Sequence, residues 1–325
     1  MFKALMVAER GAPALLQDID DAALPAGDVL VRVACSSLNY KDALGITGRG
    51  AIFKQWPMVP GIDLAGVVAH SDNPAWQAGD AVLVNGWGLG ETTWGGLAEK
   101  ARVSGDWLLR LPAAFTLQQA MAIGTAGYTA ALCVMALQRH GLTPGDGPVL
   151  VTGASGGVGS VAVLLLAGLG FEVVASTGRP HEAAHLQRLG AAQVIDRAAL
   201  SAPGKPLQSE RWAGVVDAVG SHTLANACAA TRWNGAVAAC GLAQGADFPS
   251  SVMPFILRGV TLYGINCVYV PNTLRQQAWA LLAQHVSVAA LAGMTQTITL
   301  DEAVDAATQL LQGKLHGRTV VQINN

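Results

Sequence analysis

The chain has 325 residues, a length that suits two domains better than one. Charged residues make up 13% of the sequence, hydrophobic residues 51%, and the net charge is −2. A nearly neutral chain without long runs of one sign gives no indication of binding to nucleic acid or to an anionic membrane. The low charged fraction predicts a large buried surface, with room for a subunit interface.

Cysteine usage and the first residues bear on the cellular location. The cysteines are isolated in the sequence: Cys35, Cys133, Cys228, Cys240 and Cys267. An odd number of isolated cysteines argues against a disulfide framework or a zinc ribbon and favours the reducing cytoplasm. The charges in the first ten residues leave no room for the apolar core of a signal peptide. Residues 158–175 are almost wholly apolar, but internal glycines and Glu172 favour a buried helix followed by a strand over a membrane span.

The first 120 residues are expected to be mostly β-structure. Apolar or alternating runs at 29–34, 64–69 and 81–84 predict strands separated by Gly- and Pro-rich connections. Two connections are long, residues 38–60 and 86–96. Loops of this length in a compact domain tend to be functional, so we expect site residues there.

After residue 120 the pattern changes to short apolar strands that alternate with helices. Strands are predicted at 149–152, 172–176, 193–195, 214–217, 235–240 and 260–264, and helices at 157–169, 181–189 and 274–284. This alternation predicts an α/β fold with a doubly wound parallel sheet. The alternating segment 318–323 is predicted to be an edge strand that returns to the first domain.

A glycine-rich turn follows the strand at 149–152. In the G-x-G-x-x-G slot the sequence reads Ala154-Ser155-Gly156-Gly157-Val158-Gly159. Glycine allows the backbone to turn sharply beside a pyrophosphate, and the next helix directs its first N–H groups at the phosphates. Since the turn follows a strand and opens a helix, it predicts a dinucleotide site rather than an ordinary tight turn.

The end of the next strand selects the dinucleotide. A carboxylate there would bind the ribose hydroxyls of NAD, whereas this sequence has Ser176-Thr177-Gly178-Arg179. Hydroxyls and a guanidinium suit the 2′-phosphate of NADPH. The alternative is that Arg179 is only a solvated loop residue. We predict NADPH.

An adjacent motif is misleading. His181-Glu-Ala-Ala-His185 matches the H-E-x-x-H pattern of zinc proteases. Pro180 indicates a helix start, so His181 is expected in the first turn rather than in mid-helix. We interpret both histidines as solvated and predict no metal site.

Several segments carry a resemblance to the medium-chain dehydrogenase/reductase superfamily: 37–42, 60–66, 124–129 and 152–159. Others resemble more narrowly the NADPH-dependent acrylyl-CoA reductases, also called YhdH-type quinone oxidoreductases: 39–43, 86–88, 94–99, 176–179 and 253–258. The resemblance implies a GroES-like catalytic domain of residues 1–124 and 267–325, and a Rossmann domain of residues 125–266. It also implies a homodimer that pairs edge strands near 260–264. Zinc-dependent members have Cys and His where this chain has Asn39 and Tyr40, and the resemblance therefore implies a zinc-free enzyme.

The resemblance also implies a set of cofactor contacts. These are Tyr40, Ser155, Gly156, Gly157, Val158, Thr177, Gly178, Arg179, Arg197, Leu242, Cys267 and Arg318. One segment departs from the family, which usually has Gly-Ile/Val-Asp-Ser where this chain has Gly264-Ile-Asn-Cys267. The polarity beside the nicotinamide is expected to differ there.

The reaction implied is the reduction of acryloyl-CoA to propanoyl-CoA. Such a reduction needs a hydride at Cβ, a proton at Cα and stabilisation of an enolate oxygen. The candidate catalytic residues are Tyr40 as donor, with Asn39 and Asp42 beside it. Alternatively, Tyr40 only packs against the cofactor ribose and Asp42 only makes a turn bond. Three cations in the same region could bind CoA phosphates or be solvated: Lys41, Arg49 and Lys54.

Two other functions remain open. The protein could reduce free quinones or enones without CoA, or it could bind a nucleotide without turnover. The polar segment 39–42 favours an enzyme.

Overall fold

The computed structural model describes residues 1–324 and divides the chain into two compact units. The first unit contains Met1–Thr125, Cys267–Gln277 and Leu291–Asn325, and the second contains Ala126–Asn266 and Ala278–Ala290. From the sequence, all of 267–325 was expected in the first unit, whereas the structure assigns Ala278–Ala290 to the second.

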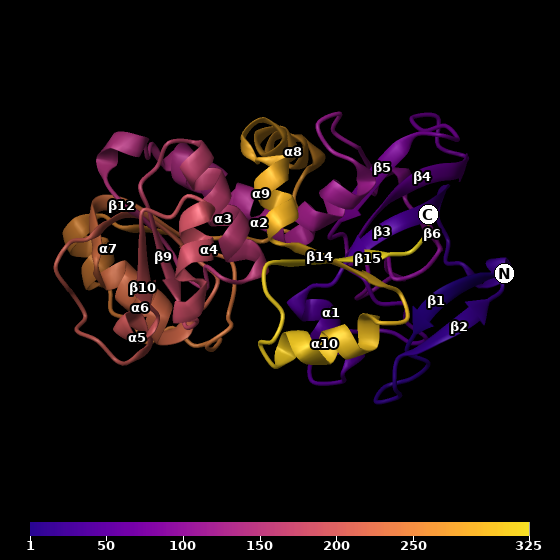
Figure 1. Ribbon diagram of the computed structural model, residues 1–325, viewed down its shortest axis with the longest axis horizontal. Helices are drawn as coiled ribbons and strands as arrows, with labels where there is room; N and C mark the ends of the chain where they lie inside the picture. Colours follow the sequence, from indigo (N-terminus) through magenta and orange to yellow (C-terminus); the bar gives the residue numbers. More distant parts are fainter. Residues whose placement is uncertain (325) are drawn as a thin grey trace. The chain divides into compact units, whose positions relative to one another are not determined.

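The second unit is built on a six-stranded parallel sheet in the order β10-β9-β8-β11-β12-β13. Its strands are β8 (Val149–Val151), β9 (Val173–Thr177), β10 (Gln193–Asp196), β11 (Trp212–Asp217), β12 (Thr231–Ala239) and β13 (Thr261–Gly264). Its helices, seen around the strands in Figure 1, are α3 (Gly157–Gly168), α4 (Ala183–Arg188), α5 (Ala198–Ser201), α6 (Ser221–Ala229) and α7 (Met253–Arg258). The strand order is that of a Rossmann fold, as predicted. β8 is fully buried because helices cover a parallel sheet.

The first unit is built mainly on a mixed seven-stranded sheet. Along the order β14-β15-β3-β4-β5-β7 only β14 and β15 are parallel, and β6 pairs with β3. The strands are β3 (Val29–Ser37), β4 (Asp63–Ser71), β5 (Ala81–Asn85), β6 (Lys100–Val103), β7 (Leu109–Arg110), β14 (Thr295–Thr299) and β15 (Arg318–Gln322). A separate hairpin-like pair is β1 (Phe2–Met6) and β2 (Leu15–Ile19). In β3 the alternate residues Val29, Val31 and Val33 are fully buried, as its apolar periodicity predicts.

Two predictions for the first unit were wrong in detail. β15 is an internal strand between β14 and β3, because an unpredicted strand, β14, takes the edge position. The polar composition of β14, Thr-Gln-Thr-Ile-Thr, suits an edge strand. It lacks the run or alternation of apolar residues from which strands were predicted elsewhere. The expected long loop 38–60 contains the short helix α1 (Tyr40–Ile46), against which α10 (Ala303–Leu311) packs.

One helix, α2 (Leu117–His140), is long and apolar enough to cross a membrane. From the sequence, a different segment, residues 158–175, was considered as a possible membrane span. In its apolar window 94% of residues are buried in the protein, which is typical of a core helix. Its path is interrupted at Gly124, where φ is 52° and ψ is −161°. Helices α8 (Asn272–His285) and α9 (Val288–Gly293) follow β13.

Candidate active site

The glycine-rich turn of the second unit joins β8 to α3. Gly153 takes a φ of +60°, and Gly156 lies just before the first residue of α3. A Cβ on Gly159 would lie 2.3 Å from the carbonyl oxygen of Gly153, so helix and turn pack too closely for any side chain there. Gly156 is exposed, and Gly157 and Val158 are partly exposed. The first amides of a helix lack intrahelical partners, and this arrangement can therefore bind a phosphate.

The end of β9 is tied to this turn. The hydroxyls of Ser155 and Thr177 are 2.7 Å apart, and the Arg179 backbone N–H donates to Thr177 Oγ1 at 3.1 Å. Ser176 is 1% exposed, and within residues 1–324 its Oγ has no hydrogen-bond partner. A buried hydroxyl left without a protein partner is costly, and a ligand oxygen would satisfy it.

Two arginines flank the same strand end. Arg197 donates its backbone N–H to Thr177 O at 2.9 Å, and its side chain lies so close to Gly178 that a Cβ there would be 2.5 Å from Nε. The Arg179 guanidinium lies 3.5 Å from Glu182 and is only partly exposed. The structure thus brings Arg197, a predicted cofactor contact, to the segment Ser176–Arg179 that is predicted to hold a 2′-phosphate.

Leu242 lies in the loop after β12 and is 61% exposed. Its Cα lies 3.2 Å from the position of a Cβ on Gly220, in the loop after β11. That loop is held by Asp217, which accepts hydrogen bonds from Gly220 N at 2.8 Å and Thr152 Oγ1 at 2.6 Å. Burial raises the pKa of Asp217. Because parallel strands end at one edge of the sheet, Leu242 and the phosphate-binding turn share that edge.

In the first unit the predicted catalytic segment forms the start of α1. Asn39 and Asp42 make a capping box in which Asp42 Oδ2 accepts the Asn39 backbone N–H at 2.9 Å. Tyr40 is the first residue of the helix and is 53% exposed. Tyr40 is therefore exposed to solvent at the start of a helix whose backbone is held by the capping box of Asn39 and Asp42.

Asp42 lies beneath the surface of this segment, and its predicted catalytic role stays a prediction. It is 1% exposed, and its Oδ1 accepts the backbone N–H groups of Gly61 at 3.1 Å and Ile62 at 3.0 Å. Burial and the charge of Asp63 raise the pKa of Asp42 to about 7, although hydrogen bonds from Asn39 and Ile62 oppose the rise.

Asp63, at the start of β4, is the centre of a buried polar cluster. It is fully buried and accepts hydrogen bonds from Ser37 N at 3.0 Å, Ser37 Oγ at 2.8 Å, Asn39 Nδ2 at 3.2 Å and Thr125 N at 2.7 Å. Arg318 completes the cluster by donating to Ser37 Oγ at 2.9 Å and to Asn39 Oδ1 at 3.4 Å. We call Ser37, Asn39, Asp63 and Arg318 the Asp63 network.

Arg318 is buried more deeply than a cofactor contact would suggest. It is 3% exposed and also donates to the Ala122 carbonyl at 2.7 Å. Burial lowers the pKa of Arg318, while the nearby Asp63 and Asp42 carboxylates act in the opposite direction. The direct contact implied by the family resemblance stays a prediction, and the contacts present favour a role through Asn39.

Cys267 begins the second segment of the first unit and is partly buried. Its carbonyl lies 3.4 Å from the guanidinium of Arg275, which is 1% exposed and also donates to Val268 O at 2.6 Å and Val270 O at 2.8 Å. The guanidinium lies 4.4 Å from the centre of the Trp87 ring. A buried arginine therefore fixes the backbone around Cys267.

The three cations suggested for CoA differ in their surroundings. Lys41 pairs with Glu91 at 2.9 Å, and Lys54 donates to the Ala51 carbonyl at 3.0 Å. Arg49 is exposed beside a hollow of about 410 Å³ between α1 and α10. The pairing of Lys41 favours a structural role for that residue.

The H-E-x-x-H segment is not one continuous helix. His181 lies in a short 3₁₀ turn, Pro180–Glu182, and His185 in α4. No group of three or more His, Cys, Asp or Glu side chains placed to hold a metal occurs within residues 1–324. The zinc-protease reading of this segment therefore has no support from its geometry.

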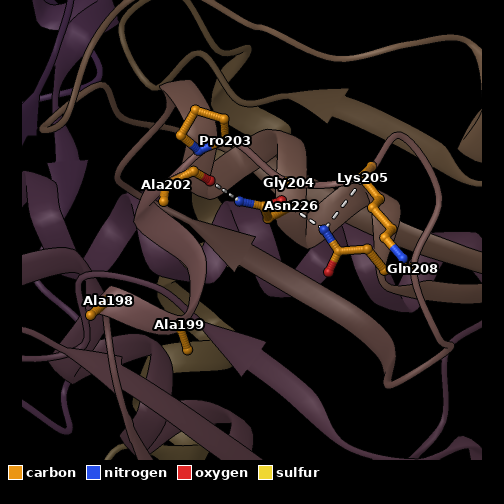
Figure 2. A pocket seen from close by; sticks show the side chains of 8 residues that line it. All are labelled: Ala198, Ala199, Ala202, Pro203, Gly204, Lys205, Gln208 and Asn226. Atoms are coloured by element: carbon orange, nitrogen blue, oxygen red, sulfur yellow. Dashed lines mark hydrogen bonds between the residues drawn. The ribbon is translucent and has the colours of Figure 1, made fainter.

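A second hollow, of about 330 Å³, lies beside α5 and the loop that follows it (Figure 2). None of the predicted site residues lines it. Asn226, at its centre, donates to the carbonyls of Leu200 and Ala202, each at 2.7 Å, and accepts from Gln208 at 2.7 Å. Because these amide groups are paired within the protein, we interpret this hollow as structural.

The sequence interpretation missed Asp63, Ser37 and Thr125 as parts of the site. A signal was present: Asp63 opens an otherwise apolar strand, where an aspartate is expected to be buried and paired. The partners of such a residue come from distant segments, so only the fold identifies them.

Comparison with known proteins gives two family matches. Residues 25–113 match the family described as alcohol dehydrogenase GroES-like domain, and residues 157–284 match the family described as zinc-binding dehydrogenase. The chain is 49% identical to the probable acrylyl-CoA reductase AcuI of Escherichia coli, over 96% of each chain. It is 47% identical to the acrylyl-CoA reductase AcuI of Ruegeria pomeroyi, over the whole of both. Among solved structures, the yhdH oxidoreductase from Salmonella enterica in complex with NADP superposes with a TM-score of 0.97 at 48% identity, covering 99% of this chain and 100% of the other.

Proposed function

The chain belongs to the medium-chain dehydrogenase/reductase superfamily, in the group that contains the acrylyl-CoA reductases, and from this we propose that it reduces acryloyl-CoA to propanoyl-CoA with NADPH. The observation that carries the cofactor choice is the end of β9. There, among the described residues, the buried Ser176 hydroxyl has no hydrogen-bond partner; it lies next to Thr177 and Arg179 in the sequence, and no carboxylate follows the strand directly. A 2′-phosphate would supply acceptor oxygens to all three side chains.

The residues of the second unit would hold the dinucleotide. The turn at Gly156–Val158 would bind the pyrophosphate, and Arg197 would lie beside the adenosine end. Bound NADPH would supply the hydride that adds to Cβ of the conjugated thioester. What remains for the protein is to position the substrate and to stabilise negative charge on the thioester oxygen.

Tyr40 is the residue we propose for the second task. Its phenol is exposed at the start of α1, and the capping box of Asn39 and Asp42 fixes the backbone beneath it. The hydroxyl would donate a hydrogen bond to the thioester oxygen as charge develops there, and a proton from solvent would then add to Cα of the enolate. Asn39 and Asp42 would act by holding Tyr40 in place.

We also propose that the protein is a homodimer in the cytoplasm. In the described chain, β13 is an edge strand that pairs only with β12. Shortly before it in the chain, α7 and the residue that precedes α7 expose large apolar side chains, with Val252, Ile256 and Leu257 each more than half exposed. An exposed strand edge with adjoining apolar surface is suited to pairing with a second copy. Sedimentation velocity should give the mass of a dimer, and Ile256→Asp should shift it toward monomer; a monomeric wild type would contradict the proposal.

A steady-state substrate panel tests the function directly. NADPH oxidation is measured with acryloyl-CoA, with a simple quinone, with an enone lacking CoA, and with no acceptor. We expect acryloyl-CoA to give the highest kcat/KM. Faster oxidation with the quinone at matched concentrations would reject the substrate assignment, and no oxidation with any acceptor would favour a non-catalytic nucleotide-binding protein.

A further inference from the structure

Asn39 lies between two opposite charges. Its Nδ2 is 3.2 Å from the Asp63 carboxylate and 3.1 Å from Ser37 Oγ, whereas its Oδ1 is 3.4 Å from the Arg318 guanidinium. Rotating the amide by half a turn would bring its oxygen against the carboxylate and its NH₂ against the guanidinium. The pair of charges therefore selects one orientation of the Asn39 amide.

Asn39 is fixed at its backbone as well. Its N–H donates to Asp42 Oδ2, and its carbonyl accepts the N–H of Ala43 at 3.0 Å. The residue that follows is Tyr40. Buried groups therefore hold both the side chain and the backbone of Asn39. Because Asn39 precedes α1, these groups also fix the direction in which the helix starts and the position of the Tyr40 backbone.

Stability alone does not account for these charges. Asp63 is fully buried and Arg318 nearly so. Apolar side chains of similar volume often stabilise a fold as well as buried charged groups do, or better. A buried polar network in which every member is paired specifies one geometry. The Asp63 network includes Asn39, which directly precedes the candidate catalytic residue Tyr40.

We propose that Asp63 is a positioning residue for the reaction, which, together with Arg318, fixes the Asn39 amide and thereby the placement of Tyr40. The inference rests on the role proposed above for Tyr40. Asp63 itself touches neither substrate nor cofactor in this proposal. Its effect on the position of Tyr40 is transmitted through Asn39. Ser37 Oγ contacts the other three members of the network, Asp63, Asn39 and Arg318.

The primary test is Asp63→Asn, which keeps the shape but places an NH₂ against existing donors. We expect kcat with acryloyl-CoA to fall about 10- to 100-fold, as expected for a small misplacement of a catalytic group, while the Kd for NADPH changes less than about twofold. Asp28→Asn is the matched control. Asp28 accepts hydrogen bonds from Asn73 at 2.8 Å and from Gly105 N at 2.6 Å, in the same unit, and lies outside the proposed site. That variant should lose thermal stability and keep its kcat.

Coupling to Tyr40 separates positioning from general damage. If Asp63 acts through Tyr40, the double variant Asp63→Asn/Tyr40→Phe should turn over no more slowly than the slower single variant. Losses that multiply would overturn the proposal. Should Asp63→Asn fail to fold, Ser37→Ala removes the shared hydroxyl without changing a charge, and a drop of at least about threefold in kcat with the same coupling is expected; an unchanged kcat would overturn it.

A measurement without substrate keeps this inference distinct from the proposed function. Hydrogen exchange of the amides at 40–43, at the start of α1, should be faster in Ser37→Ala than in wild type. Exchange of the amides in the strands of the first unit should be the same in both proteins. If acryloyl-CoA is not reduced by the wild type, the proposed function fails, and exchange still decides whether the Asp63 network holds this segment. Unchanged exchange at 40–43 would overturn the positioning role.

Discussion

The hydroxyl oxygens of Ser155 and Thr177 lie 2.7 Å apart, and they join the glycine-rich turn to the end of the next strand. The turn contacts the pyrophosphate in a dinucleotide site, and the strand end contacts the adenosine ribose. This hydrogen bond thus joins the two halves of the proposed cofactor site.

Arg179→Ala should weaken the binding of NADPH far more than that of NADH. The change removes a charge-assisted contact to the 2′-phosphate, worth about 1.5–3 kcal/mol, which corresponds to roughly a 10- to 100-fold rise in Kd. Fluorescence titration of both cofactors measures it. Arg188→Ala, an exposed arginine of α4, is the control and should leave both affinities unchanged. Equal losses for the two cofactors in Arg179→Ala would contradict the prediction.

Tyr40→Phe should lower turnover while preserving cofactor affinity. The ring remains, so packing at the start of α1 is kept, but a donor to the developing oxyanion is lost. Loss of one such donor typically reduces kcat by ~10²–10³. Single-turnover kinetics with acryloyl-CoA, together with a titration of NADPH, separates chemistry from binding. If turnover survives, the hydroxyl has no chemical role, and stabilisation comes from the cofactor ribose or the backbone.

Asp42→Asn should flatten the pH dependence of stability. The pKa of Asp42 is raised to about 7 in the folded protein from a usual value of 3.8. The folded state therefore binds a proton more tightly than the unfolded chain. The stabilisation from Asp42 is complete below about pH 4 and is lost as the pH rises toward 7, by at most about 1.4 kcal/mol for each pH unit. Urea denaturation at several pH values should give a steeper fall for wild type than for the variant, and identical slopes would refute this account.

Gly124→Ala should destabilise the protein by about 2–5 kcal/mol. The backbone there has φ 52° and ψ −161°, a region that side chains rarely adopt. A Cβ would also lie 2.5 Å from the Arg318 guanidinium and 2.6 Å from Ser37 Oγ. Gly145→Ala, where a Cβ meets no atom within 4 Å, should stay within about 0.5 kcal/mol of wild type. Thermal denaturation of both variants provides the comparison, and equal midpoints would show that Gly124 is not constrained.

The sequence predicted some elements well because their signals are local. The apolar runs of β8 and β11 and the turn at 153–159 depend on neighbours in the chain, and they identified the Rossmann unit. β14 was missed because its exposed polar residues have no apolar periodicity. The Asp63 network was missed for another reason: Asp63 and Arg318 are 255 positions apart in the sequence, and only sheet pairing brings them to the same core.

The phosphate-binding turn requires glycine at some of its positions and not at others. The position that needs a left-handed backbone is Gly153, at φ +60°, whereas Ala154 keeps an ordinary backbone and donates its N–H to the Ser176 carbonyl at 3.0 Å. Alanine at 154 is therefore compatible with this turn, whereas the conformation at 153 and the packing at 159 require glycine. A recognition pattern centred on the first motif glycine would overlook chains with alanine at 154, and one anchored on the conformation at 153 and the helix packing at 159 would find them.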